Sequence, residues 1–133
     1  MSEEFEIRPI GWVRRSGRDA SPEEVCEIEL LPEFEEGLEG IERQSEIIVL
    51  FLFDRSKGYE LKLRPRNDPE NPLMGVFATR SPRRPNAIGL DQVELLGRKG
   101  NVLTVRGLTA FDGTPVIDIK PVKRWDGKDI KCK

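Results

Sequence analysis

The run Glu46-Ile47-Ile48-Val49-Leu50-Phe51-Leu52-Phe53 decides the fold of this chain of 133 residues. After its first residue the run is continuously apolar, and it is rich in β-branched and aromatic side chains. That composition is typical of a strand buried at the centre of a sheet. The run is far too short to cross a membrane, and the chain contains no longer apolar run. We therefore expect a central strand over residues 46–53 and no membrane-spanning segment.

Shorter strand-like segments lie on both sides of this central strand. Two of them bracket the turn-forming Arg98-Lys99-Gly100-Asn101, which predicts a hairpin. The expected strands are residues 5–13, 25–31, 46–53, 59–63, 74–78, 88–96, 102–108 and 116–122. The inward positions expected in the first strand are Phe5, Ile7, Ile10 and Trp12.

One segment, residues 32–41, carries a helical pattern. Phe34, Leu38 and Ile41 recur at helical spacing, and Pro32 stands near the start, where proline is well tolerated. About eight short strands and one short helix predict a mainly β fold. We expect a single domain over residues 1–133, built as a closed or nearly closed β-barrel.

The charge balance argues against a general nucleic-acid binder. The chain has 22 basic and 24 acidic residues, for a net charge of −2. The acidic residues concentrate in residues 19–46, and the basic ones in residues 55–84 and 120–133. Such segregation produces either a cationic face or acidic segments that fold against basic ones, within the chain or across a dimer. Charge alone favours acidic segments that fold against basic ones.

Several classes of chemistry are excluded by what the sequence lacks. There is no histidine, and Cys26 and Cys132 stand far apart, so neither a zinc site nor a histidine-based triad is expected. No phosphate-binding or dinucleotide-binding glycine motif occurs. The N-terminus has no signal-peptide pattern, which favours a cytoplasmic protein with reduced thiols, although a Cys26–Cys132 bridge stays open. What remains is binding, or transfer of a group from an activated donor.

The stretch GVFATRSPRRPNAIGL, residues 75–90, predicts a binding loop. It contains three arginines, whose guanidinium forks suit carboxylates, phosphates and planar rings. Its two prolines restrict the backbone and reduce the entropy lost on ordering. Any single arginine could instead be held by one of the many glutamates. Three of them in a stiffened loop favour a site for an anionic or planar ligand.

Two further segments carry polar residues beside strands. In DGTPVIDIKP, residues 112–121, Asp118 and Lys120 share the strand face opposite Ile117 and Ile119. They either pair with each other or face a site. In Phe53-Asp54-Arg55, at the end of the central strand, the polar pair is either functional or a solvated ion pair.

These two stretches, residues 75–90 and 112–121, closely resemble the two signature segments of the TsaA-like (TrmO-like) family. Supporting matches include Ile10-Gly11 and Arg64-Pro65-Arg66, so the resemblance extends over essentially the whole chain. It implies an S-adenosylmethionine-binding β-barrel that works as a homodimer. The activity it implies is methylation of tRNA at N6 of threonylcarbamoyl-adenosine, beside the anticodon.

The resemblance also implies roles for individual residues. The expected cofactor contacts are Arg80, Leu90, Phe53, Asp54, Gly107, Leu108, Thr109 and Ala110, together with part of residues 18–23. The expected RNA contacts are Arg83, Arg84 and Arg66. No metal ligand is expected.

The chain departs from the family pattern at several positions. Asp54 stands where many relatives have histidine, Asp91 replaces a small hydroxyl residue, and Thr109 replaces an acidic residue. The bacterial enzymes also continue past the second signature into a further domain implicated in tRNA handling. The resemblance therefore implies cofactor binding more directly than it implies the tRNA substrate.

Methyl transfer from a sulfonium donor depends on in-line approach more than on acid–base chemistry. A carboxylate that accepts the N6 proton would make the amine more reactive, and Asp118 and Asp112 are the candidates. Two alternatives stay open. One is a module that binds S-adenosylmethionine without transferring its methyl group, and the other is an RNA-binding barrel that needs no cofactor.

Overall fold

A closed antiparallel barrel of six strands forms the body of the protein, in the order β1-β2-β7-β6-β3-β8. The computed structural model describes residues 3–17 and 20–124, so Cys132 and part of the 18–23 segment lie outside the described residues. The barrel strands are β1 (Gly11–Arg14), β2 (Val25–Leu30), β3 (Glu46–Leu52), β6 (Ile88–Lys99), β7 (Val102–Arg106) and β8 (Pro115–Pro121). The expected mainly β, single-domain barrel is confirmed.

The central position expected for residues 46–53 is confirmed by the pairing of β3. Its residues pair with β6 on one side and with β8 on the other. Ile47, Val49 and Phe51 point into the barrel and are at most 2% exposed. Ile48, Leu50 and Leu52 lie half-buried on the outer face. The run is apolar throughout because neither face of β3 is freely exposed to water.

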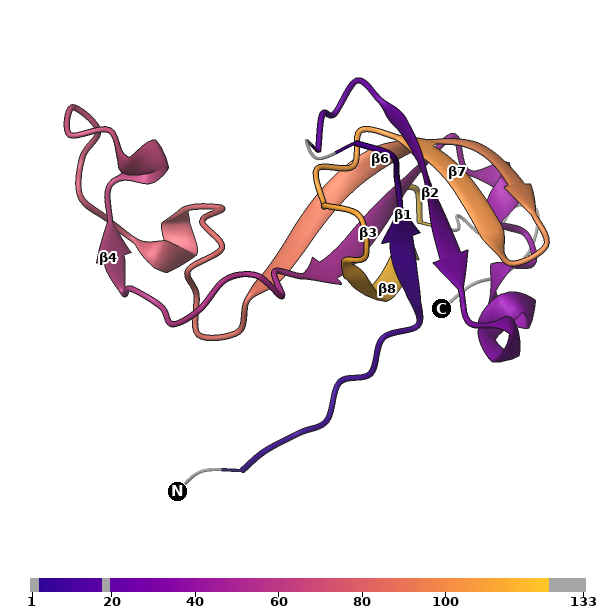
Figure 1. Cartoon of the computed structure of the whole chain (residues 1–133), viewed down its shortest axis with the longest axis horizontal. Coiled ribbons are helices and arrows are strands. Elements are labelled where there is room, and N and C mark those ends of the chain that lie inside the picture. The colour runs from indigo at the N-terminus through magenta and orange to yellow at the C-terminus, as the bar shows by residue number, and fades with distance from the viewer. Residues whose placement is uncertain (1–2, 18–19, 125–133) are drawn as a thin grey trace.

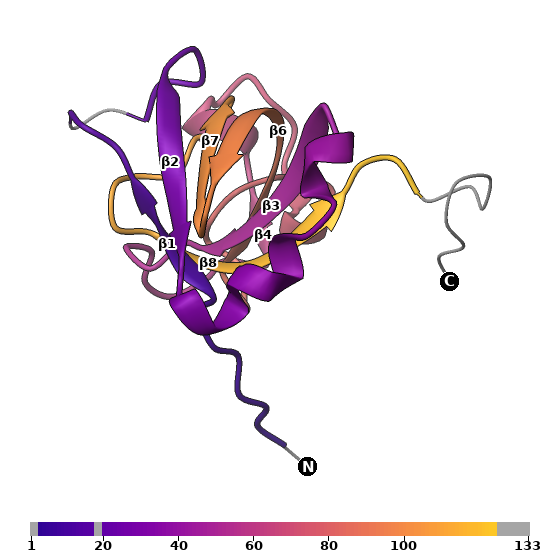
Figure 2. The same cartoon turned by 90° about the vertical axis from the view of Figure 1, so that its right-hand side faces the viewer.

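The helical segment after β2 forms two short 3₁₀ helices. They are η1 (Pro32–Leu38) and the single turn η2 (Ile41–Arg43). Leu38 is 2% exposed and belongs to the core cluster, against which Phe34 and Ile41 also pack. Figure 2 shows these turns lying at one end of the barrel, between the end of β2 and the start of β3. The segment thus covers that end with apolar side chains.

The prediction for residues 5–13 was wrong in both length and phase. Only Gly11–Arg14 forms β1, while Phe5 and Ile7 are 84% and 57% exposed. The inward residues of β1 are Gly11 and Val13, and Trp12 points outward; Ile10, just before the strand, packs against the core as expected. A Cβ on Gly11 would collide with the Glu29 carbonyl oxygen. The strands approach so closely that a residue without a side chain takes an inward position, which an apolar pattern does not reveal.

Other strand boundaries also shifted. The expected strand at 59–63 is reduced to β4 (Lys62–Leu63), and 74–78 becomes β5 (Met74–Gly75) followed by the turn η4 (Val76–Ala78). By contrast, β6 continues to Lys99, because its polar residues still pair with β7 across a register shift between Leu95 and Gly97. Tertiary pairing therefore extends a strand beyond its apolar pattern.

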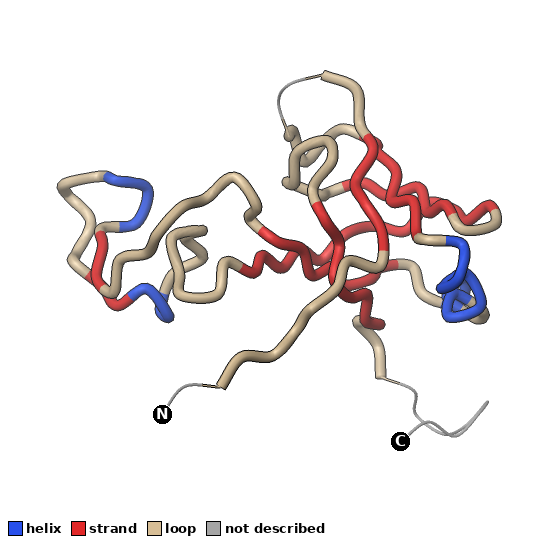
Figure 3. The backbone as a smooth tube through the Cα atoms, turned by 60° about the horizontal axis from the view of Figure 1, so that its bottom comes forward, coloured by secondary structure: helices blue, strands red, loops and turns tan. Residues whose placement is uncertain are grey.

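Residues 53–87, between β3 and β6, leave the barrel and form what we call the lobe. It contains the small sheet β4–β5 and the turns η3 (Pro65–Asn67) and η4. Figure 1 shows the lobe extending to the left of the barrel, and Figure 3 shows the same separation from another direction. Within the part of the chain that the structure describes, no helix has the length and apolar character to cross a membrane.

Candidate functional site

Three consecutive residues of β6, Gly89-Leu90-Asp91, bring together the segments expected to bind the cofactor. The Arg80 guanidinium donates a hydrogen bond of 2.9 Å to the Leu90 carbonyl. The Asp91 carboxylate accepts 2.8 Å hydrogen bonds from both the backbone N–H and the hydroxyl of Thr109. Phe53 packs over Gly89. Segments far apart in the sequence thus meet at the start of one strand.

Gly89 is required for this meeting. A Cβ at this position would lie 2.5 Å from Phe51 Cε1 and 2.8 Å from Phe53 Cζ. The two rings contact each other edge to face, with centroids 5.3 Å apart. The absence of a side chain at Gly89 therefore gives Phe53 room to pack against β6, and Asp54, the next residue, is exposed.

Asp91 and Thr109, two positions at which the chain departs from the resemblance drawn above, contact each other. The Thr109 hydroxyl donates a 2.8 Å hydrogen bond to the Asp91 carboxylate. The structure thus joins β6 to the segment after β7 through these two side chains.

Arg15 is a residue at this site that the sequence reasoning missed. Its side chain is 2% exposed. Nη1 donates to the carbonyls of Leu108 at 2.9 Å and Ala110 at 2.7 Å, and Nη2 donates to the Ser21 carbonyl at 3.0 Å. The inward phase of Gly11 and Val13 continues to Arg15, so the correct phase of β1 would have indicated its burial.

The arginines of the 75–90 stretch have different roles. Arg80 is exposed and carries the contact to Leu90. Arg84 donates 2.9 Å hydrogen bonds to the carbonyls of Thr79 and Ser81, so it holds its own loop together. Arg83 Nε lies 3.7 Å from Glu60 Oε1 in an exposed ion pair. Arg66, in the lobe, is exposed and has a φ of 59°.

Asp118 and Leu90 share the outer face of the barrel. Both residues are register partners of Leu50, so they flank it on adjacent strands, about 10 Å apart. One oxygen of Asp118 accepts the Ile119 N–H at 2.9 Å, and the other lies 2.9 Å from Lys120 Nζ. The sequence had left pairing with Lys120 open, and that pairing is present.

Asp112 lies elsewhere, against the β1–β2 loop. Its carboxylate accepts the Arg15 backbone N–H at 2.8 Å. The Arg55 guanidinium stacks 4.5 Å from the centre of the Phe111 ring and donates weakly to the Asp112 carbonyl at 3.4 Å. The structure thus does not bring Asp112 and Asp118 together, and Arg55 contacts the β7–β8 loop.

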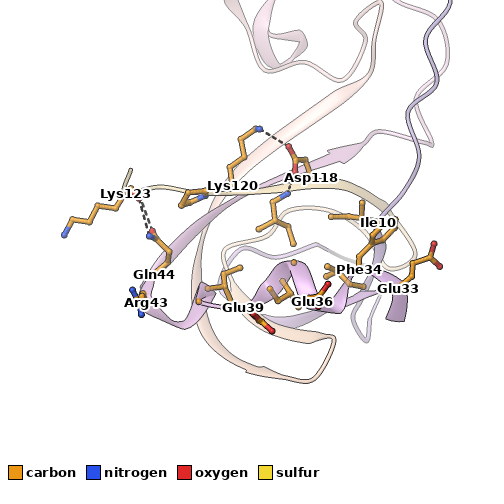
Figure 4. A pocket seen from close by; sticks show the side chains of 17 residues that line it. Ile10, Glu33, Phe34, Glu36, Glu39, Arg43, Gln44, Asp118, Lys120 and Lys123 are labelled. Atoms are coloured by element: carbon orange, nitrogen blue, oxygen red, sulfur yellow. Dashed lines mark hydrogen bonds and ion pairs between the residues drawn. The ribbon is translucent and has the colours of Figure 1, made fainter. Parts of the chain in front are cut away.

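A cavity of about 930 Å³ opens at the end of the barrel where η1 and η2 lie, where β3 begins and β8 ends. Figure 4 shows it between η1, η2 and the last residues of β8, with Asp118 and Lys120 on one wall. The Asp118 carboxylate accepts the backbone N–H of Ile119, and Pro121 has no N–H to offer. Asp118 and Pro121 therefore protect this edge of β8 from pairing with another strand. None of the eight expected cofactor residues lines this cavity.

Two titratable groups near the β1–β2 loop have altered proton affinities. Burial raises the pKa of the Cys26 thiol, which is 3% exposed, so the thiol stays protonated at neutral pH and is no nucleophile. A 2.6 Å hydrogen bond from the Ser21 hydroxyl lowers the pKa of the exposed Glu23 carboxyl. Among the described residues, no group of three potential metal ligands occurs.

A sequence model of the tRNA-methyltransferase O N-terminal domain (TrmO_N) matches residues 15–126. The chain belongs to this family. A probable S-adenosyl-L-methionine-binding protein of Archaeoglobus fulgidus is 47% identical over 124 residues, which cover 87% of this chain and 33% of that protein. A second protein of that organism, an S-adenosyl-L-methionine-binding protein, is 43% identical over 86% of both chains.

The fold also matches solved structures of the family. A crystal structure of TrmO from Pseudomonas aeruginosa superimposes with a TM-score of 0.72 at 36% identity, covering 91% of this chain and 57% of that one. The chain therefore spans about half of this TrmO, a third of the first relative and 86% of the second. Family membership confirms the resemblance drawn from the two signature stretches.

Proposed function

We propose that this protein binds S-adenosylmethionine beside Gly89-Leu90-Asp91 and transfers its methyl group to N6 of threonylcarbamoyl-adenosine in tRNA. The observation that carries the proposal is the convergence of Phe53, Arg80 and Thr109 on these three residues. The family and the names of the relatives support the choice of cofactor. The expected contacts Leu108 and Ala110 lie in the segment that Arg15 and Asp91 hold in place.

Arg80 is the proposed anchor for a carboxylate of the ligand. Within the described residues its side chain makes one hydrogen bond, through Nη1 to the Leu90 carbonyl. Arg80 is exposed, so the other N–H groups of its guanidinium are accessible and can form a two-pronged hydrogen bond with a carboxylate.

Asp118 is the favoured candidate for accepting the N6 proton. It shares the Leu90 face, and one of its oxygens lies 2.9 Å from the ammonium of Lys120. Asp112 remains the second candidate, with its carboxylate engaged by the Arg15 backbone. Either residue would act beside a donor that is already activated, so positioning is the main requirement.

The arginines of the basic segment 55–84 support a role for RNA; Arg66 and Arg83 are exposed, and Arg84 is half-buried. Within the described residues, the acidic segment 19–46 forms ion pairs with Arg14, Arg15 and Arg98, none of which belongs to the basic segment 55–84. We propose that Arg66, Arg83 and Arg84 face tRNA phosphates or the modified base. An unpaired anticodon base is open to stacking and edge recognition. This substrate implies a cytoplasmic protein.

We also propose a homodimer in which a second copy covers the cofactor surface. The lobe exposes large apolar side chains that a monomer has no reason to present to water, namely Tyr59 at 57%, Leu61 at 61%, Leu73 at 55% and Phe77 at 75% exposed. The expected cofactor residues do not line the described 930 Å³ cavity; Arg80, Leu90 and Thr109 are exposed, whereas Leu108 and Ala110 are buried. A second copy would supply the missing wall.

One observation favours a second candidate function, cofactor binding without methyl transfer. Both oxygens of Asp118 already have partners in Ile119 and Lys120, so a structural role suffices for this residue. Two relatives are also named for binding S-adenosylmethionine rather than for a reaction.

Two measurements separate the candidates. Calorimetry with S-adenosylmethionine tests the cofactor, and absence of binding would leave only an RNA-binding barrel. Methyl-labelled cofactor is then incubated with tRNA of verified threonylcarbamoyl content. Transfer of label to the modified adenosine supports the enzyme, whereas tight binding without any transfer leaves the binding module.

A further inference from the structure

The buried guanidinium of Arg15 has no close counter-ion among the described residues. Its side chain is 2% exposed, and the nearest described carboxylate oxygen, on the largely exposed Glu24, is 3.9 Å from Nη2. Its Nε is buried without any hydrogen-bond partner among the described residues. Burying a charge with incomplete pairing is costly, and an apolar side chain would fill the end of a barrel at less cost. The stability of the barrel therefore does not explain why arginine occupies this position.

The partners of Arg15 indicate what it does. Nη1 bridges the carbonyls of Leu108 and Ala110, at 2.9 Å and 2.7 Å, and so constrains the backbone on both sides of Thr109. Nη2 reaches the Ser21 carbonyl in the β1–β2 loop at 3.0 Å. A planar fork can hold three carbonyls in a fixed arrangement, which an ammonium group cannot do.

The same short segment is also held by Asp91. Its carboxylate takes the N–H and the hydroxyl of Thr109, both at 2.8 Å. Arg15 reaches the segment from the buried side, where Leu108 is 0% and Ala110 is 4% exposed. Three consecutive residues are thus fixed by two charged groups from two distant parts of the chain. Such fixing reduces the entropy that a ligand must overcome on binding.

We propose that Arg15 is a positioning residue for the cofactor. It holds residues 108–110 in the binding geometry before the cofactor arrives, and it couples them to the β1–β2 loop through Ser21. Arg15 itself does not touch the cofactor. This inference rests on the proposed function, because residues 108–110 are assigned to S-adenosylmethionine there.

The test compares Arg15→Met and Arg15→Lys with the matched control Arg14→Met. Arg14 is the neighbouring arginine, but its side chain is 61% exposed and it pairs with Glu29 on the outer face. Affinity for S-adenosylmethionine is measured by calorimetry below the unfolding transition of every variant. We expect the dissociation constant to rise about 10-fold or more for Arg15→Met, less for Arg15→Lys, and by less than about 2-fold for Arg14→Met.

Amide NMR spectra of the proteins without cofactor give a second measurement. A loss of global stability alone would not change the amide signals of residues 108–110 selectively. In both Arg15 variants we expect the amides of Leu108, Thr109 and Ala110 to broaden or shift, while those of Val49 and Ile47 stay in place. If Arg15→Met fails to fold, Thr109→Val tests the clamp from the Asp91 side, because it removes one of the two hydrogen bonds. We expect about 10-fold weaker binding there as well.

The outcomes are distinct. Wild-type protein that does not bind S-adenosylmethionine overturns the proposed function and this inference together. Wild-type binding with unchanged affinity in Arg15→Lys and Thr109→Val overturns only the inference. Equal losses in the Arg15 variants and in Arg14→Met also overturn it, because they would point to general charge rather than to the clamp.

Discussion

The barrel and the lobe are stabilised to very different degrees by their own side chains. The barrel encloses a continuous core of buried apolar residues contributed by all six of its strands and by η1. The lobe, residues 53–87, has two buried apolar residues, Leu63 and Val76, and exposes four large ones. The barrel therefore has an apolar core of its own, whereas the lobe buries few apolar side chains. The candidate cofactor site lies where the two regions join.

The largest expected effect comes from breaking the barrel core. Leu103 on β7 is 0% exposed, and Leu103→Ala leaves a cavity in a closed structure. We expect the free energy of unfolding to fall by about 2–5 kcal/mol. Urea denaturation monitored by circular dichroism measures the change. A loss below about 1 kcal/mol would mean that the barrel relaxes around the cavity.

The junction between the regions is tested by Gly89→Ala. The added methyl group would meet Phe51 and Phe53 at less than 3.0 Å, so one ring must move. We expect a loss of about 1–3 kcal/mol in the free energy of unfolding.

Gly97→Ala is the control for this change, because it lies on the same strand and a Cβ there would meet no described atom within 4 Å. Denaturant unfolding of both variants makes the comparison. Equal stability of the two variants would contradict the close packing at Gly89.

The contact from the lobe to the barrel is tested by Arg80→Ala. Loss of the bond to the Leu90 carbonyl and of the remaining guanidinium donors should weaken S-adenosylmethionine binding about 10-fold. Calorimetry measures the affinity. Lys57→Ala is the control, because it removes another exposed positive charge from the lobe. Unchanged affinity in Arg80→Ala would refute its assigned role.

The smallest expected effect on global stability comes from the lobe itself. Val76 is 1% exposed, yet Val76→Ala should lower the free energy of global unfolding by less than about 1 kcal/mol, because the lobe opens locally first. Hydrogen exchange should show faster exchange of the Val76 amide, which donates to the Leu61 carbonyl, with little change at Val93 in the barrel. Equal acceleration at both amides would show that lobe and barrel unfold together.

Much of the barrel could be predicted from the sequence, because the patterns that indicate its strands are local. The apolar run of β3, the turn between β6 and β7, and the alternation in β2 and β8 all predicted strands that the structure contains. The phase of β1 was missed because Gly11 has no side chain to mark the inward face, and that error concealed Arg15. The short strands of the lobe were overestimated, since their apolar residues do not enter a common core.

The site was predictable as separate segments but not as an arrangement. The two signature stretches indicated which segments to expect, and the resemblance supplied their roles. No sequence pattern indicated that Arg84 supports its own loop through Thr79 and Ser81 while Arg80 reaches Leu90. Neighbouring arginines look alike in a sequence, and their partners depend on the path of the backbone.

The amino-acid sequence alone determined the mainly β character of the chain, its central strand and its family. These follow from hydrophobic periodicity and from residue types in fixed order, which do not depend on distant parts of the chain. The tertiary structure alone decided that Asp91 meets Thr109 and that Arg15 lies beneath Leu108 and Ala110. Those contacts join residues 18 to 95 positions apart, so they exist only once the barrel has closed.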